Sequence, residues 1–125
     1  MKSILIISAS LFWTISSMGQ TTNPNLDSAL AKSLGADDYG MKKYVLVILK
    51  TGSNTSTNKT TTDSLFAGHL KNINRLADMN KLVVAGPMAQ NDNKYRGIFI
   101  LNVQTTEEAK ELLDTDPTIK NHIFE

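Results

Sequence analysis

The chain has 125 residues, 13 of them Lys or Arg and 12 Asp or Glu, with two His and no Cys. The charges nearly balance, and the sequence has no basic stripe or polybasic patch. This excludes binding to nucleic acid or to anionic membranes that is driven by charge. The absence of Cys excludes disulfides, thiol nucleophiles and Cys-type zinc sites, and two His are a poor basis for any metal site, so we expect neither a metal nor a cofactor.

The first 19 residues have the layout of a secretory signal peptide. Lys2 provides a basic start, residues 4–15 (ILIISASLFWTI) an apolar core, and residues 16–19 (SSMG) small side chains for cleavage. A buried N-terminal helix is the alternative. We favour a signal peptide because the run has the right flanking residues and is too short to span a bilayer with margin. Cleavage after Gly19 leaves about 105 residues, enough for one domain, with no Cys for a lipid anchor. We therefore expect a periplasmic or secreted protein with no membrane segment after cleavage.

Residues 20–42 are polar and irregular, with Pro24 among scattered small residues. A short helix is possible over residues 26–34. The segment is either a tether between signal and domain or an arm that packs on the domain, and the sequence leaves both interpretations open.

Three later segments are short and apolar, as strands are: residues 44–49 (YVLVIL), 82–85 (LVVA) and 97–103 (GIFILNV). The first and third are apolar at successive positions rather than alternate ones, which is typical of strands covered on both faces. Gly86 and Pro87 close the second strand, and residues 51–63 (TGSNTSTNKTTTD) are predicted to form a loop.

Residues 63–80 are predicted to form a helix with Asp63 as its N-cap. Apolar side chains recur along it at helical spacing: Leu65, Phe66, Leu70, Ile73, Leu76 and Ala77. His69 precedes Ile73 by four positions and Leu76 by seven, so it should point inward with them. A buried imidazole needs a partner, and the alternative to a functional site is a hydrogen-bonded core histidine.

A second helix is predicted over residues 105–115, because Thr105 and Glu108 have the spacing of a capping box. Asp116-Pro117 ends that helix, since proline disfavours a helical residue before it.

The predicted order β-α-β-β-α is five sixths of a ferredoxin-like βαββαβ domain, an α+β fold with an antiparallel sheet. Only residues 122–125 (HIFE) remain for the closing strand, so we expect that this strand is truncated or that a partner completes the sheet. Two helices cover one face of such a sheet, although its strands are apolar on both faces. A second copy packing sheet against sheet would cover the other, which predicts a homodimer.

From about Tyr44 to Phe124 the chain resembles the YCII-related family, small ferredoxin-like domains that dimerise as α/β barrels. Three segments carry the likeness: residues 66–70 (FAGHL) continuing to 75–76 (RL), residues 82–87 (LVVAGP), and residues 107–110 (EEAK) leading to 114–117 (DTDP). The secreted form with a polar arm is similar to a subgroup found in Bacteroidetes-type bacteria. We place the signal peptide at 1–19, the arm at 20–42 and the domain at 43–125.

The resemblance implies an active-site pair, a His on the first helix and an Asp in the Asp-Pro motif, which match His69 and Asp116. It implies a cofactor-free lyase, isomerase or dehydrohalogenase acting on a small cyclic or lactone-like substrate. A carboxylate at Asp116 would fix the tautomer of His69 and raise the basicity of its other nitrogen. The alternatives are that Asp116 caps the Pro117 turn, and that the protein is a non-catalytic small-ligand-binding or dimerisation module.

Further site candidates surround this pair. Gly86, Pro87 and Met88 are candidate walls of a substrate pocket, and Arg96 or Arg75 could hold an anionic substrate. Gly86 and Pro87 can equally form only a turn, and the two arginines can equally be solvated surface. His122 is expected to be exposed and without a role in the site.

Overall fold

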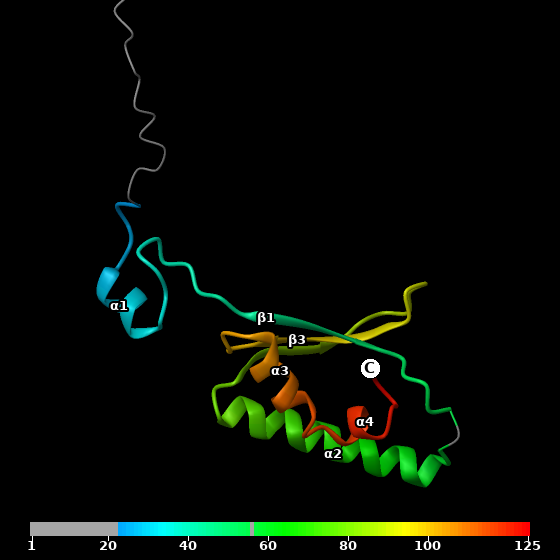
Figure 1. Cartoon of the computed structure of the whole chain (residues 1–125). Coiled ribbons are helices and arrows are strands. Elements are labelled where there is room, and N and C mark those ends of the chain that lie inside the picture. Colours follow the sequence, from blue (N-terminus) through cyan, green and yellow to red (C-terminus); the bar gives the residue numbers. More distant parts are fainter. Residues whose placement is uncertain (1–22, 56) are drawn as a thin grey trace, which may run out of the picture.

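The computed structural model describes residues 23–55 and 57–125 (Figure 1). The predicted signal peptide therefore lies outside the described residues. The elements follow in the order α1 (Ser28–Ser33), β1 (Val45–Lys50), α2 (Lys59–Asp78), β2 (Leu82–Pro87), β3 (Tyr95–Leu101), α3 (Thr106–Leu113) and α4 (Pro117–Lys120). Within the described ranges, no helix combines the length and apolar character needed to cross a bilayer.

The three strands form one antiparallel sheet in the order β1-β3-β2. This is the strand order of a ferredoxin-like domain, and the predicted α+β fold with an antiparallel sheet is confirmed. The observed strand ends differ from the predicted ones by at most two residues, a shift that side-chain periodicity does not resolve. Figure 1 shows α2, α3 and α4 on the same side of the sheet.

The core lies between the helices and the inner face of the sheet. Its buried apolar side chains come from all three strands, from α2 and α3, and from the last residues: Leu49, Leu76, Leu82, Phe99, Leu101, Val103, Ala109 and Phe124. On the outer face, Leu46 is paired with Ile100 and Ile100 with Val84, giving one apolar row across the sheet. Leu46 and Val84 remain 62% and 41% exposed, so the described residues leave this row largely uncovered.

The predicted start of the first long helix was wrong. That helix, α2, begins at Lys59, and Asn58 rather than Asp63 is its N-cap, accepting a hydrogen bond from the Thr61 N–H (2.9 Å). Residues 59–62, predicted to be loop, therefore extend the helix by one turn. Asp63 instead lies inside α2 and forms an i,i+4 ion pair with Lys59.

The last residues run along the edge of β1. Thr51 forms an antiparallel bridge with Phe124, and Lys50 exchanges two backbone hydrogen bonds with Glu125 (2.8 and 3.1 Å). These residues lie where the closing strand of a ferredoxin-like sheet begins. Their pairing also carries Phe124 into the core beside the ring of His69.

The arm contains the short helix that the sequence allowed. Asp27 caps α1 through the Leu30 N–H (2.9 Å), and Ala31 is buried within the arm. Figure 1 shows α1 beyond the amino end of β1, apart from the sheet and its covering helices.

Candidate active site

His69 is buried in α2, as its spacing predicted. It is 8% exposed and shares the inward stripe of the helix with Asn72 and Leu76. Aromatic rings surround the imidazole: Phe99 stacks on it at 5.9 Å between ring centroids, and Phe124 meets it edge-on at 5.5 Å. The ring orientation of His69 is therefore set by packing as well as by hydrogen bonds.

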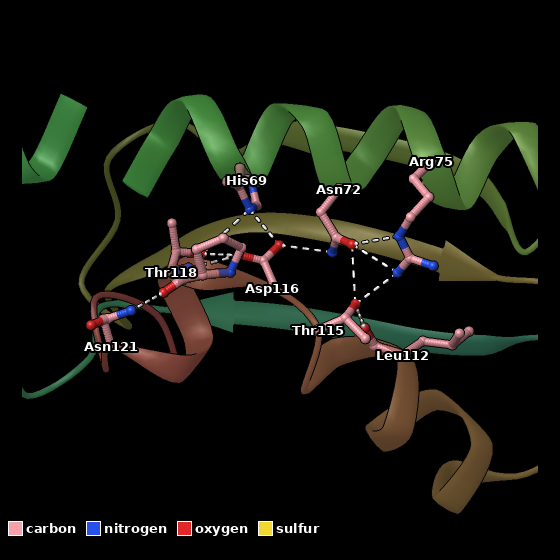
Figure 2. A network of polar contacts seen from close by, with 9 residues as sticks. His69, Asn72, Arg75, Leu112, Thr115, Asp116, Thr118 and Asn121 are labelled. Atoms are coloured by element: carbon pink, nitrogen blue, oxygen red, sulfur yellow. Dashed lines mark hydrogen bonds and ion pairs between the residues drawn. The ribbon is translucent and has the colours of Figure 1, made fainter. Parts of the chain in front are cut away.

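Asp116 lies opposite His69 and is fully buried. Its Oδ2 is 2.7 Å from His69 Nδ1 and 3.4 Å from Asn72 Nδ2 (Figure 2). Its Oδ1 accepts hydrogen bonds from the Thr118 N–H (2.9 Å) and the Thr118 hydroxyl (2.6 Å), which makes Asp116 the N-cap of α4. The two interpretations of Asp116, helix cap and histidine partner, therefore both hold, with one carboxylate oxygen for each.

The hydrogen bonds around Asp116 favour its ionised form. Burial alone would raise the pKa of Asp116, but the hydrogen bonds from His69 and Thr118 outweigh burial, and the pKa lies below its ordinary value of 3.8. The carboxyl group is then ionised at neutral pH and can only accept hydrogen bonds. We therefore assign a proton to His69 Nδ1, which leaves Nε2 as the nitrogen that can exchange a proton.

Nε2 of His69 is reached from open space. Nε2 has no hydrogen-bond partner among the described residues. Because every buried side-chain nitrogen and oxygen of those residues does have a partner, Nε2 is not fully buried. The open space is a cavity of about 430 Å³ beneath the sheet, in which His69 and Arg96 are the ionisable lining residues. The rest of the lining is mostly apolar: Leu49, Phe66, Leu70, Ile73, Ala85, Gly86, Pro87, Gly97, Phe99 and Phe124.

The predicted site residues divide between this cavity and its surroundings. Gly86, Pro87 and Arg96 line it, whereas Met88 lines a neighbouring polar hollow that also reaches Arg96. Arg75 does not line either hollow. It donates to Asn72 Oδ1 (2.8 Å) and to the Thr115 hydroxyl (2.8 Å), and so joins α2 to the end of α3 (Figure 2).

The approach of α2 to α4 depends on a glycine that the sequence reasoning did not single out. A Cβ atom at Gly68 would lie 2.8 Å from Pro117 Cγ, closer than real Cβ contacts allow. The missing side chain thus lets the helix turn that carries His69 pack directly on the turn that carries Asp116. A small residue beside an inward-facing histidine is the only signal in the sequence for this contact.

Asn72 and Thr118 were also missed. Asn72 follows His69 by three positions, so a polar residue on an apolar stripe was a usable signal. Thr118 stands two residues after Asp116, where an N-cap carboxylate reaches the backbone N–H. Together they supply three of the four hydrogen-bond contacts of the carboxylate. Among the described residues, no three His, Cys, Asp or Glu side chains gather as a metal site would need.

Comparison with known proteins gives the family. Residues 43–125 match the YCII-related domain, so the chain belongs to the YCII-related family. A solved structure of 5-chloro-2-hydroxyhydroquinone dehydrochlorinase (TftG) from Burkholderia phenoliruptrix AC1100, in complex with 2,5-dihydroxybenzoquinone, is similar at 21% identity and a TM-score of 0.41. The alignment covers 64% of this chain and 85% of that one. No curated protein matches the chain at a significant level.

Proposed function

We propose that this member of the YCII-related family is a cofactor-free acid–base enzyme in which His69 transfers a proton and Asp116 positions and polarises it. One observation carries the proposal. His69 Nδ1 is bound to a buried, ionised carboxylate at 2.7 Å, while Nε2 opens into a cavity large enough for a small cyclic or lactone-like molecule. A base oriented by a third group in this way is the arrangement that general acid–base catalysis requires.

The chemistry follows from the free lone pair on Nε2. Nε2 takes a proton from a carbon next to a carbonyl group, and the C–H electron pair becomes an enolate. The imidazolium then returns the proton at another carbon, which is an isomerisation, or a leaving group departs with its electron pair, which is an elimination. The negative charge of Asp116 stabilises the imidazolium between these two steps. Lyase, isomerase and dehydrohalogenase reactions all contain this first step.

The test is proton exchange with solvent, because it needs no knowledge of the natural substrate. The protein is incubated in D₂O with α-angelica lactone and with cyclohexanone, and deuterium incorporation and double-bond migration are followed by ¹H NMR. We expect exchange above the buffer rate for the natural chain and for His122→Asn, the exposed histidine, and a loss of about 10²- to 10⁴-fold in His69→Gln. Equal rates in the natural chain, His69→Gln and buffer would contradict the acid–base assignment.

A second candidate function has an observation of its own. The His69–Asp116 contact ties α2 to the cap of α4, so the pair also holds the fold together. A non-catalytic protein that binds a small ligand in the same cavity would keep this contact for stability alone. Binding of either compound without proton exchange is the outcome that favours this candidate.

We further propose that two copies associate through the outer face of the sheet. The row Leu46–Ile100–Val84 crosses all three strands and remains uncovered by the described residues. Two such faces can pack about 10 Å apart and exclude water from one another. Light scattering should give a dimer mass for the natural chain and for Leu30→Glu, a leucine on α1 that is 54% exposed, and a monomer mass for Leu46→Glu. A monomeric natural chain, or a dimeric Leu46→Glu variant, would contradict this interface.

The proposed setting is the periplasm or the exterior of a Bacteroidetes-type bacterium, after removal of residues 1–19. Mass spectrometry of the secreted protein tests this, since cleavage after Gly19 makes Gln20 the first residue.

A further inference from the structure

We propose that the cavity accepts an organic anion, a single unsaturated ring bearing a carboxylate, and that Arg96 binds the carboxylate. The proposal rests on the proposed function in one respect, namely that the His69 cavity is a ligand site. It adds the chemical class of the ligand and the residue that selects it.

The first argument is the backbone at Arg96. β3 alternates, with Gly97, Phe99 and Leu101 buried toward the helices, so Arg96 would by alternation face outward with Ile98 and Ile100. The pairing with β1 shifts at this point: Leu49 pairs with Gly97, and Lys50 pairs with Tyr95, which leaves Arg96 as the extra residue of a β-bulge. A bulge re-aims a side chain. Accordingly, Arg96 lines the His69 cavity on the inner side.

The position of the guanidinium group agrees with this. Its central carbon lies 6.0 Å from the centroid of the Phe124 ring, and the same ring meets the imidazole of His69 edge-on at 5.5 Å. One aromatic side chain therefore contacts both the proposed base and the arginine. A ligand that fills the cavity must lie close to both groups.

The second argument is charge. Arg96 forms no ion pair with any described residue, and no Asp or Glu lines the cavity or the neighbouring hollow. Asp116, behind His69, is fully buried and already holds four contacts. An unpaired guanidinium at the edge of an apolar cavity favours an anion, and its planar donors match a carboxylate in two parallel hydrogen bonds.

The third argument is the shape and chemistry of the walls. The cavity volume of about 430 Å³ is at the small end for ligand sites and suits a single ring. Phe66, Phe99 and Phe124 offer aromatic faces and edges, which pack well against a flat unsaturated ring. The apolar walls bind the ring, and Arg96 holds the anionic end so that ring carbons lie toward Nε2 of His69.

The test compares benzoate with benzamide, a neutral molecule of nearly the same shape. Binding of each to the ¹⁵N-labelled protein is measured by NMR titration in the natural chain, in Arg96→Gln, and in Lys94→Gln as the matched control from the same hairpin. We expect the natural chain and Lys94→Gln to bind benzoate about 10- to 100-fold more tightly than benzamide, the gain typical of a charge-assisted contact. In Arg96→Gln this preference should disappear.

Three outcomes would overturn the proposal: no binding of either compound, equal binding by the natural chain, or an undiminished preference in Arg96→Gln. Benzoate preference and proton exchange, both measured on the natural chain, separate the two proposals. A natural chain that prefers benzoate but shows no proton exchange leaves the anion site standing and removes the enzyme assignment. Proton exchange without a benzoate preference does the reverse.

Discussion

Replacing Asp116 with Asn tests the central contact of the site with little change of shape. The amide oxygen of Asn can still accept the two hydrogen bonds from Thr118, which hold the cap of α4. The amide nitrogen then faces His69 Nδ1, and an amide nitrogen only donates. His69 must respond by accepting at Nδ1, which moves its proton to Nε2. The nitrogen that faces the cavity then loses its free lone pair.

The size of the effect follows from the contacts that change. A hydrogen bond to a charged group contributes about 1.5–3 kcal/mol, and the Asn variant replaces the charged contact with His69 by a neutral one. We therefore expect the free energy of unfolding to fall by about 1–3 kcal/mol while the fold is retained. Proton exchange catalysed through Nε2 should fall by about 10²- to 10⁴-fold, the usual contribution of a positioned base.

The assay is long-range ¹H–¹⁵N NMR of the His69 ring, which distinguishes the two neutral tautomers, together with urea unfolding. Asp114→Asn serves as the control, since Asp114 is exposed at the end of α3 and does not contact His69. A His69 ring that keeps its proton on Nδ1 in Asp116→Asn would refute the assigned tautomer. A loss of stability no larger than that of Asp114→Asn would refute the energetic argument.

Three further predictions follow from the same contacts. Folding lowers the pKa of Asp116, so its stabilising contribution is complete above pH 3.8 and is lost as the pH falls through the lower folded-state pKa. In urea unfolding from pH 2 to 6, this contribution to the fall in unfolding free energy should be present in the natural chain and absent in Asp116→Asn. Gly68→Ala should destabilise the fold by up to about 2 kcal/mol, because crowding against Pro117 costs about 1–3 kcal/mol and the gain in helix propensity returns about 1. Its His69 Nδ1–H chemical shift should also move, and a more stable variant with an unchanged shift would contradict the close approach. Thr118→Val should lower the free energy of unfolding by about 1–2 kcal/mol and raise the pKa of Asp116, because the hydroxyl hydrogen bond to the carboxylate is lost. ¹³C NMR titration of the carboxyl group measures this pKa, and an unchanged value would contradict the role of the hydroxyl.

Local patterns in the sequence were sufficient for the three strands, for α2 and α3, and for one side of the site, whereas α4 was not predicted. The apolar spacing along α2 directed His69 inward, because the period of a helix depends only on neighbouring residues. The Asp116-Pro117 step marked a helix boundary for the same reason. The start of α2 was wrong because Asn58 and Asp63 are both good N-caps, with nearly equal local free energies, and the packing of the whole helix decides between them.

The sequence by itself determined the order of elements, the inward face of α2 and the candidate pair His69 and Asp116, since periodicity, capping and the family likeness are all written in short segments. Only the tertiary structure decided that these two residues, 47 positions apart, meet at 2.7 Å. That contact depends on the absence of a side chain at Gly68 and on hydrogen bonds from α2 and α4 that converge on one carboxylate. The direction of Arg96 was likewise decided by a strand register, which is set between strands and cannot be read from either one alone.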